Sequence, residues 1–453
     1  MESSLNPKKR LKEEFVSNLK GSSMLEIAAL SSLIPLLFVF QHSISSFYTN
    51  GCNVRIKKHH GSSYMAILTL DFLFLLLPTL FFLTVLAEWI FISAILLAAL
   101  IFTIAAKRVA TSTCYSQGSL SLSSIISSYR VLVMAVTCLC ILAVDFRIYP
   151  RRYAKTETYG TSLMDCGVGS FILANSLVSR QARSLSFVSL KASIQSTSPL
   201  LLLGFGRLLS TNTVDYQVHV GEYGVHWNFF FTLAAVSILT SIIRVPPQYS
   251  GILGLAILIG YQFWLVNGLN VYLLSDERGA DILSKNKEGI FSILGYWSMY
   301  LLGVQFGYYL FFGNQSSTKM KSIKWARIRV LFFSLLLWLI TVILDRHVES
   351  VSRRMCNMAY VTLVLAQSFQ VLAILMLSDF IAGSRMSLLE EAVNRNLLGT
   401  FLLANVLTGL VNMSVDTLFS TTPSALFILL VYAYVLSISA GLLQFYGVRL
   451  KFW

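Results

Sequence analysis

The segment Val131-Leu-Val-Met-Ala-Val-Thr-Cys-Leu-Cys-Ile-Leu-Ala-Val144 decides the fold, because it carries no charge and ends abruptly at Asp145. A helix that spans a bilayer needs about 20 predominantly apolar residues. In hydrocarbon, backbone N–H and C=O groups must be satisfied within their own segment, so an apolar run of this kind is expected to be a helix. We place this span at residues 129–145.

Similar runs recur along the whole chain. The 453 residues are 55% hydrophobic and 12% charged, whereas soluble domains carry about 25% charged residues. The short alternating segments of a β-barrel are not seen. The sequence therefore predicts an all-α, polytopic transmembrane helical bundle of about 13 spans, near residues 24–41, 64–86, 88–106, 129–145, 162–179, 192–209, 227–243, 251–274, 289–312, 328–344, 358–379, 396–413 and 422–445.

One membrane domain is expected over residues 1–453, with a short N-terminal tail at 1–23, because no linker, low-complexity segment or internal repeat divides the chain. The missing repeat also disfavours an inverted-repeat transporter. An odd number of spans puts the termini on opposite sides, but the Lys and Arg counts of the loops do not fix which side is which. The glycosylation sequons at Asn314 and Asn412 would then lie on opposite sides, so at most one should be modified.

The net charge of +14 comes from basic residues in short loops beside apolar runs. Interfacial anchoring and topology control explain most such residues, so a nucleic-acid partner is not expected. A pocket for an anionic head group or a phosphorylated ligand is the alternative. The six cysteines are scattered without metal or disulfide spacing. Because Walker, nucleophile-elbow, HExxH and Rossmann motifs are missing, we expect neither a metal site nor a permanently bound cofactor.

The most informative polar stretch is Asp145-Phe-Arg-Ile-Tyr-Pro-Arg-Arg-Tyr-Ala-Lys-Thr-Glu-Thr-Tyr-Gly-Thr-Ser-Leu-Met-Asp165. It places four basic and three acidic residues between two apolar spans. Pro150 prevents one helix from running through it, and the segment 160–162 is typical of a helix cap. Such a charged, aromatic-rich connection suits a pocket at the membrane surface.

Asp145 and Lys155 are the candidate catalytic pair within this stretch. Burial at the end of an apolar run would raise the pKa of Asp145, while nearby basic residues would lower it, and a carboxylate balanced in this way can act as a general base. Lys155 could polarise a carbonyl or orient the carboxylate. The alternative is an Asp–Arg pair that fixes a helix end.

A second cluster, Glu222-Tyr-Gly-Val-His-Trp-Asn-Phe-Phe-Phe231, leads into the seventh predicted span. His226 could carry a proton or bind a substrate, or it could belong to the interfacial belt beside Trp227. Asp71 lies inside the second predicted span. An ionisable residue at that depth is a functional hypothesis, with a hydrogen bond inside the bundle as the alternative.

These two clusters resemble a known family. Residues 151–170, the preceding residues 145–150 and the segment 222–231 are similar to the motifs of the PIG-W-type glucosaminyl-phosphatidylinositol inositol acyltransferases of GPI-anchor biosynthesis. The resemblance covers essentially the whole chain. Tyr153 and Tyr159 stand where some members have Phe and Trp, which preserves an aromatic ring.

The resemblance implies transfer of a fatty acyl group, usually palmitoyl, from acyl-CoA to the inositol 2-hydroxyl of glucosaminyl-phosphatidylinositol. Acyl-CoA would be a co-substrate, and the setting would be the endoplasmic reticulum membrane, with the N-terminus and the active site facing the lumen. Partners are then the two substrates and the bilayer, while protein partners stay unknown.

The expected roles follow from that chemistry. Asp145 would take the hydroxyl proton and Lys155 would stabilise the oxyanion, or the two roles would be exchanged if the pKa of Lys155 is depressed. The apolar bundle would hold the acyl chain. The remaining candidates bind the phosphates or the glucosamine or orient the groups that do; they are Arg147, Arg151, Arg152, Glu157, Asp165, His226 and Asn228.

Two rival hypotheses remain at this stage. One keeps acyl transfer but centres it on His226 with Asn228. The other is a lipid or solute transporter that uses Asp71 and Asp145 as intramembrane carboxylates.

Overall fold

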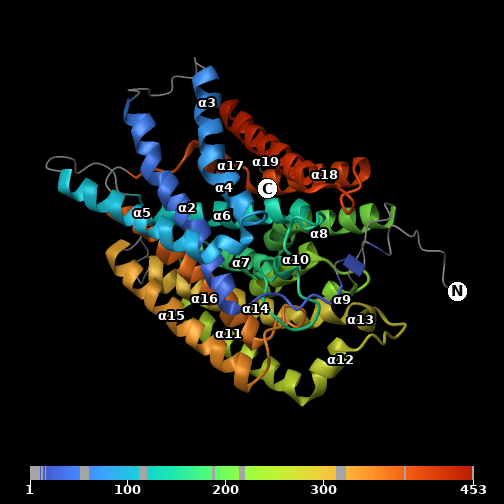
Figure 1. Cartoon of the computed structure of the whole chain (residues 1–453). Helices are drawn as coiled ribbons and strands as arrows, with labels where there is room; N and C mark the ends of the chain where they lie inside the picture. The colour runs from blue at the N-terminus through green and yellow to red at the C-terminus, as the bar shows by residue number, and fades with distance from the viewer. Residues whose placement is uncertain are drawn as a thin grey trace.

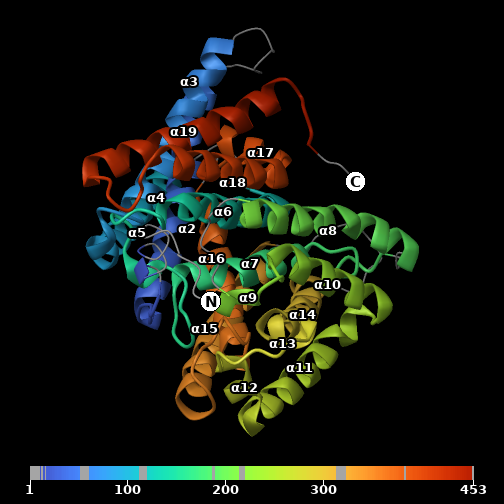
Figure 2. The same ribbon diagram turned by 90° about the vertical axis from the view of Figure 1, so that its right-hand side faces the viewer.

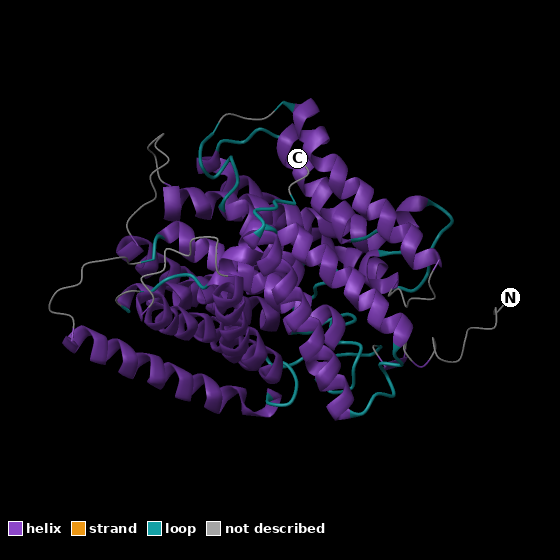
Figure 3. Cartoon of the chain, turned by 90° about the horizontal axis from the view of Figure 1, so that it is seen from above, coloured by secondary structure: helices purple, strands orange, loops and turns teal. Residues whose placement is uncertain are grey.

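The helical bundle is seen in a computed structural model that describes residues 11, 14–15, 17–51, 61–111, 120–185, 189–213, 220–312, 323–381 and 384–450. Within these residues the regular structure is helical, and the β-type pairing consists of isolated bridges from Gly21 and Ser22 to Thr161 (Figure 3). The predicted all-α membrane fold is confirmed.

The α-helices run from α2 near the N-terminus to α19 near the C-terminus. They are α2 (Met24–Gly51), α3 (Gly61–Asp71), α4 (Leu77–Phe82), α5 (Ile90–Thr111), α6 (Leu122–Ala143), α7 (Leu163–Leu177), α8 (Leu190–Thr213), α9 (Val220–Tyr223), α10 (Phe229–Ile242), α11 (Pro247–Trp264), α12 (Asn270–Leu274), α13 (Ile282–Lys285), α14 (Lys287–Gly307), α15 (Ile323–His347), α16 (Met358–Leu375), α17 (Leu388–Arg395), α18 (Leu397–Ser414) and α19 (Thr422–Phe445). Single turns of π-helix (Phe72–Leu76, Leu265–Leu269, Tyr308–Phe312) and of 3₁₀-helix (Ala87–Trp89, Arg151–Tyr153, Met376–Phe380) extend or join them.

Ten helical segments in the described chain are long and apolar enough to cross a membrane. Two shorter apolar helices, α7 and α10, coincide with the fifth and seventh predicted spans. Helix α8 coincides with the sixth but carries Lys191 and Arg207, and it is not among the ten. The membrane-spanning character is confirmed, and the count of about 13 stays a prediction.

Two details differ from the predicted spans. The span at 251–274 is broken at the π turn Leu265–Leu269, where Gly268 has a φ of 113°, a conformation that costs glycine little. Helix α17 falls in a segment for which no helix was predicted. It begins with a capping box in which Ser387 and Glu390 bond each other's backbone N–H, a start signal that the spacing Ser-x-x-Glu carries.

Side-chain caps set where several helices begin. Ser121, Ser162, Asn228 and Asn357 each accept a hydrogen bond from a backbone N–H of the first turn, at the starts of α6, α7, α10 and α16. These N–H groups have no partner inside the helix, and Ser and Asn are favoured there for that reason. The cap at Ser162 matches the predicted start of the fifth span.

Helix α16 lies at the centre of the bundle. Its apolar window is 83% buried, whereas that of α5 is 11% buried, so α5 exposes its side chains to lipid. Helix α15 packs along α16, α11 along α14, α8 along α10 and α2 along α5. Helices α3, α17, α18 and α19 gather at one end of the molecule, and α11, α12 and α15 at the other (Figures 1 and 2).

A polar cluster inside the bundle holds α17 in place. His42 Nε2 lies 2.8 Å from Glu390 Oε2, and both side chains are buried. Asp71 accepts hydrogen bonds from the Leu389 N–H at 3.1 Å and from the Gln41 amide at 2.5 Å. The intramembrane carboxylate of Asp71 therefore has a structural role at the start of α17.

This cluster generates a stability prediction. Breaking a buried pair by removing one partner costs about 3–5 kcal/mol, so we expect Glu390→Ala to lower the apparent melting temperature of the detergent-solubilised protein. Scanning fluorimetry would measure the shift. The matched control is Glu391→Ala, because Glu391 is the exposed neighbour on the same helix. Equal melting temperatures for the two variants would contradict the role given to Glu390.

Candidate active site

The connection between α6 and α7 folds over the end of the bundle. Helix α6 ends at Ala143, and Pro150 precedes the 3₁₀ turn Arg151–Tyr153, so the prediction that no single helix runs through this stretch is confirmed. The Arg151 guanidinium donates to the carbonyl oxygens of Val144 and Phe146 at 2.8 and 3.2 Å. Arg151 therefore closes the C-terminal end of α6, where carbonyl groups are otherwise unpaired.

Arg152 ties this connection to the start of α2. Its guanidinium lies 2.7 Å from Glu26 and 2.7 Å from Glu88, and the Tyr153 hydroxyl also donates to Glu26 at 2.7 Å. Arg147 differs, because its side chain is exposed and lies over the Phe419 ring at 5.5 Å. Of these arginines, Arg147 is therefore the one whose side chain is exposed, and its role in binding a ligand stays a prediction.

Four ionic side chains from three separate segments form the centre of the site. Lys155 Nζ donates to both carboxylate oxygens of Glu222, at 2.7 and 2.9 Å. Arg353 donates to the same carboxylate at 3.1 Å and to Asp165 at 2.8 Å. The result is a continuous chain of alternating charge, Lys155–Glu222–Arg353–Asp165, which we call the ion chain.

The ion chain is held by the backbone around it. Asp165 accepts from the N–H and hydroxyl of Thr156, with the hydroxyl at 2.7 Å. The segment that carries Arg353 is fixed by the Ser352 hydroxyl, which donates to the Thr158 carbonyl at 2.6 Å. The Tyr360 hydroxyl donates to the Asp165 carbonyl at 2.8 Å. These bonds connect the 145–162 connection to the start of α16.

Burial and mutual attraction set the ionisation of the side chains in the ion chain. Burial alone would raise the pKa of the Glu222 carboxyl, but Lys155 and Arg353 hold it at about 2. Burial lowers the pKa of Lys155, and Glu222 opposes that shift. Burial would also lower the pKa of Arg353, but Glu222 and Asp165 raise it above its usual value. Glu222 is therefore an ionised carboxylate at neutral pH.

Lys155 lies at one end of a cavity of about 220 Å³ inside the bundle. Its side chain is 37% accessible and lines this cavity. Arg207 and Glu222 also line this cavity, and its walls are mostly apolar residues of α6 and α7, with smaller contributions from α2, α16 and α18. A charged end and an apolar slot can together hold an acyl chain with a reactive head group.

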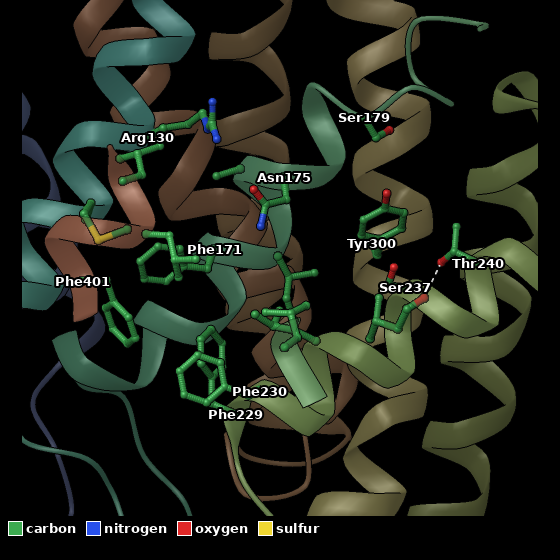
Figure 4. Close-up of a pocket in the computed structure, with 18 of the residues that line it drawn as sticks. Arg130, Phe171, Asn175, Ser179, Phe229, Phe230, Ser237, Thr240, Tyr300 and Phe401 are labelled. Carbon is green, nitrogen blue, oxygen red and sulfur yellow. Dashed lines mark hydrogen bonds between the residues drawn. The ribbon is translucent and has the colours of Figure 1, made fainter. Parts of the chain in front are cut away.

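A larger cavity of about 660 Å³ adjoins the first, and Phe171, Phe229 and Phe401 line both. Figure 4 shows these rings gathered with Phe230 at one side of the larger cavity, while hydroxyl groups such as those of Ser237 and Tyr300 face its other side. Three basic side chains also line it: Arg130, Arg180 and Arg395. Among the described residues, no group of three His, Cys, Asp or Glu is placed to hold a metal ion.

Asp145 is buried and accepts a hydrogen bond of 2.7 Å from the Asn412 amide of α18. The carboxylate that directly contacts Lys155 is Glu222 rather than Asp145. Lys155 lines the smaller cavity, whereas Asp145 is not among the residues that line either of the two cavities. The catalytic roles of both residues stay predictions.

The other predicted site residues are distributed differently. Asp165 belongs to the ion chain, whereas Glu157 is exposed and accepts from the Asn18 N–H at 2.6 Å. The His226 side chain is exposed. The Asn228 side chain caps α10 and donates to the Gly204 carbonyl at 3.0 Å. Asp165 is thus the residue of this group that the structure joins to Lys155, through the rest of the ion chain.

Sequence reasoning assigned no role to two members of the ion chain. Glu222 is the first residue of the motif 222–231, so its carboxylate could have been predicted as a site residue from the sequence. Arg353 lies in the loop between α15 and α16. A basic residue beside an apolar span usually controls membrane topology, so nothing in the sequence marked Arg353 as a site residue. Arg207 lies near the end of the sixth predicted span, where a basic side chain can reach the membrane surface by snorkelling, and in the structure it lines the smaller cavity.

These features define a polytopic α-helical membrane protein with a buried ionic site beside intramembrane cavities. The chain belongs to the GWT1 family, whose model matches residues 8–443. It is 58% identical to an uncharacterised protein of Arabidopsis thaliana, over 93% of this chain and 99% of that protein. The family resemblance inferred from the motifs is confirmed.

Two further relatives have functional names. The chain is 34% identical to the glucosaminyl-phosphatidylinositol-acyltransferase PIGW of Bos taurus, over 98% of this chain and 99% of that protein. It is 36% identical to GPI-anchored wall transfer protein 1 of Aspergillus oryzae, over 94% and 95%. Because coverage is nearly complete on both sides, the similarity is not confined to one motif.

The contact between Asp145 and Asn412 generates a prediction about modification. N-glycosylation would use the same amide nitrogen that donates to Asp145, so we expect Asn412 to carry no glycan. The other sequon, Asn314, lies outside the described residues. An Asn314→Gln variant produced in eukaryotic microsomes should show no mobility shift on endoglycosidase treatment. A shift that disappears when Asn412→Gln is added would contradict the contact.

Proposed function

We propose that this protein transfers a fatty acyl group from acyl-CoA to the inositol 2-hydroxyl of glucosaminyl-phosphatidylinositol during GPI-anchor biosynthesis. The names of its relatives supply the reaction class. The observation that carries the proposal is Lys155, which is paired with an ionised carboxylate at the charged end of an apolar intramembrane slot. A soluble nucleotide-binding fold is not needed for this chemistry.

The acyl donor fits the two adjoining cavities. The acyl chain would occupy the smaller cavity, since burying each methylene in apolar surroundings contributes about 0.8 kcal/mol. The phosphates of CoA would lie beside Arg130, Arg180 and Arg395 in the larger cavity, because guanidinium groups bind phosphate in a bidentate manner. The thioester would then lie beside Lys155, and acyl-CoA would act as a co-substrate rather than as a resident cofactor.

The reaction requires a base for the hydroxyl proton and a positive group for the oxyanion. When the inositol oxygen attacks the thioester carbon, negative charge develops on the carbonyl oxygen, and the Lys155 ammonium would stabilise it. Asp145 would accept the hydroxyl proton. When the tetrahedral intermediate collapses, the thiolate of CoA leaves and takes up a proton. Glu222 and Arg353 would hold Lys155 in position.

The acceptor lipid would be bound by the exposed charges of the same end. Arg147 is exposed there, and Arg207 lines the cavity, so these two would meet the phosphate of phosphatidylinositol. Arg151 and Arg152 already bond to backbone and to acidic side chains, and they would shape the site without touching substrate. Glu157 would lie at its outer edge.

The proposed setting is the endoplasmic reticulum membrane, with the ion chain on the lumenal side. This orientation follows the family resemblance and puts Asn314 in a cytosolic loop. A glycan on Asn314 would therefore contradict it.

The two rival hypotheses lose support. His226 has an exposed side chain, whereas Asp145 is buried, so His226 is the less suitable of the two for a reaction inside the bundle. For a transporter, Asp71 would have to change partners during the cycle, yet it bonds to Gln41 and to the start of α17. Its observed contacts suit a fixed structural role.

The first functional test is transfer of labelled palmitoyl from palmitoyl-CoA to glucosaminyl-phosphatidylinositol by the purified protein in detergent. We expect product from the wild type and a fall in kcat of about 100-fold or more for Lys155→Ala and for Asp145→Ala. His226→Ala should retain part of the activity, because its side chain is exposed.

The outcomes separate the hypotheses. Product from all three variants would support the acyltransferase activity but would reject the catalytic roles given to Asp145 and Lys155. Loss of product in His226→Ala with activity in the other two would move the site to the second motif. No product from a folded, monodisperse wild type would contradict the proposed reaction for this chain acting alone.

The pH dependence tests the role of Lys155. As an oxyanion stabiliser Lys155 works in its protonated form, so activity should fall as pH rises through its pKa, which burial lowers from the usual value. Glu222→Gln removes the carboxylate that opposes this shift, so the alkaline limb of the kcat profile should move to lower pH. Glu157→Gln is the matched control, because Glu157 is exposed and bonds to Asn18. Movement of an acidic limb in place of the alkaline limb would assign Lys155 as the base.

A further inference from the structure

Helices α6 and α7 place two arginines of the larger cavity at the end of the bundle opposite to the ion chain. Arg130 lies in the first half of α6, ~20 Å along the helix from its last residue, Ala143. The connection that carries Lys155 begins there. Helix α7 returns through the bundle, with Asp165 of the ion chain in its first turn and Arg180 just after its C-terminal end. Because α6 and α7 pack against each other, the two arginines share the end away from Lys155.

Helix α18 places the third arginine at the same end. Arg395 just precedes this helix, which packs against α6. Asn412 lies in the last turn of α18, ~22 Å further along the helix, and donates to Asp145 at 2.7 Å. Asp145 belongs to the same connection as Lys155. The predicted catalytic pair and the three arginines are therefore at opposite ends of the bundle, and we call the second of these the arginine end.

The larger cavity is cationic at the arginine end. Among the described residues that line this cavity are three arginines and no aspartate or glutamate. Arg180 and Arg395 are exposed, so both can be reached from water. Arg130 is partly buried, and the neighbouring charge that acts on it is another cation, Arg183. Guanidinium groups bind phosphate in a bidentate manner, so this end of the cavity is suited to a ligand with phosphate groups.

Helix α10 connects the arginine end to the ion chain. Its side chains line the larger cavity from Phe229 to Thr240, ~17 Å along the helix. The Thr240 carbonyl accepts a hydrogen bond from Gln181 at 3.4 Å, which places this part of α10 beside the C-terminal end of α7. Phe229 also lines the smaller cavity, as Lys155 does, and Figure 4 shows Phe229 and Thr240 well apart along the larger one. The larger cavity therefore leads from the arginine end toward Lys155.

An acyl-CoA molecule has the same division into charged and apolar parts. Moving the charge of its phosphates into apolar surroundings is very unfavourable, whereas its acyl chain gains from burial. The pantetheine arm, which contains two amide groups, separates the phosphates from the thioester. The phosphates would bind at the arginine end, and the arm would extend along α10 beside hydroxyl groups such as that of Ser237. The thioester would then reach Lys155.

We propose that the two substrates bind from opposite faces of the membrane, acyl-CoA with its phosphates at the arginine end and the acceptor lipid with its phosphate at the end of the ion chain. The inference rests on the proposed acyl transfer and adds the side from which the donor arrives. With the ion chain on the lumenal side, acyl-CoA would bind from the cytosol, and free CoA would return to the cytosol. The acyl group would cross the membrane inside the enzyme, without acyl-CoA in the lumen.

The experiment measures KM separately for palmitoyl-CoA and for the acceptor lipid with the purified protein in detergent. The double variant Arg130→Gln with Arg395→Gln should raise the KM for palmitoyl-CoA by about tenfold or more, because hydrogen bonds to a charged group are lost, and should leave the KM for the acceptor unchanged. Arg147→Gln, at the end of the ion chain, should do the reverse. Arg244→Gln is the matched control, because Arg244 is exposed just after α10 and is not among the residues that line the larger cavity.

Both KM values come from one preparation, so a smaller folded fraction lowers the apparent kcat without changing them. A donor KM in the double variant that rises no more than the acceptor KM, or no more than in Arg244→Gln, would overturn the inference while leaving the acyl transfer intact. A donor KM that rises in Arg147→Gln would place the phosphates of CoA at the end of the ion chain and also overturn it. An unchanged acceptor KM in Arg147→Gln would reject the acceptor half. A wild type that does not use palmitoyl-CoA would overturn the proposed function itself.

Discussion

The ion pair between Lys155 and Glu222, extended through Arg353 to Asp165, is the interaction on which the rest of the site depends. It joins the 145–162 connection, α9 and the loop before α16, which are far apart in the sequence. A buried charge without a partner is strongly destabilising. The three segments must therefore fold together, and each member of the ion chain is held by its neighbours as well as by its own backbone.

The same constraint explains why this site can sit against an apolar slot. Lys155 lines the smaller cavity, and Glu222 balances its charge, so the positive group is not isolated in a medium of low dielectric constant. Attraction within the ion chain keeps Glu222 ionised despite its burial. The opposite end of the bundle uses a second buried cluster, His42 with Glu390, to hold α17, whose last residue lines the larger cavity.

Much of this was accessible from the sequence, and the misses have physical causes. The interruption of the helix in the stretch that contains Pro150 and the cap at Ser162 follow from local backbone chemistry, so they could be predicted. The partner of Lys155 could not, because Glu222 is 67 positions away and nothing in either local sequence encodes the other. Asp145 is ten residues from Lys155 and was the natural partner to choose, yet its carboxylate turns to Asn412 on α18.

The sequence by itself determined that the chain is embedded in a membrane, that it is helical and which motifs mark the site. Apolar side chains favour hydrocarbon, and the backbone of each segment must be hydrogen-bonded there, so both effects act on each segment separately. The tertiary structure alone decided which charges are neighbours and which side chains line the cavities. These properties depend on how helix ends coincide in space. Arg353 is an example. In the sequence it looks like a basic loop residue that sets membrane orientation, but in the structure it bonds to two carboxylates, those of Asp165 and Glu222.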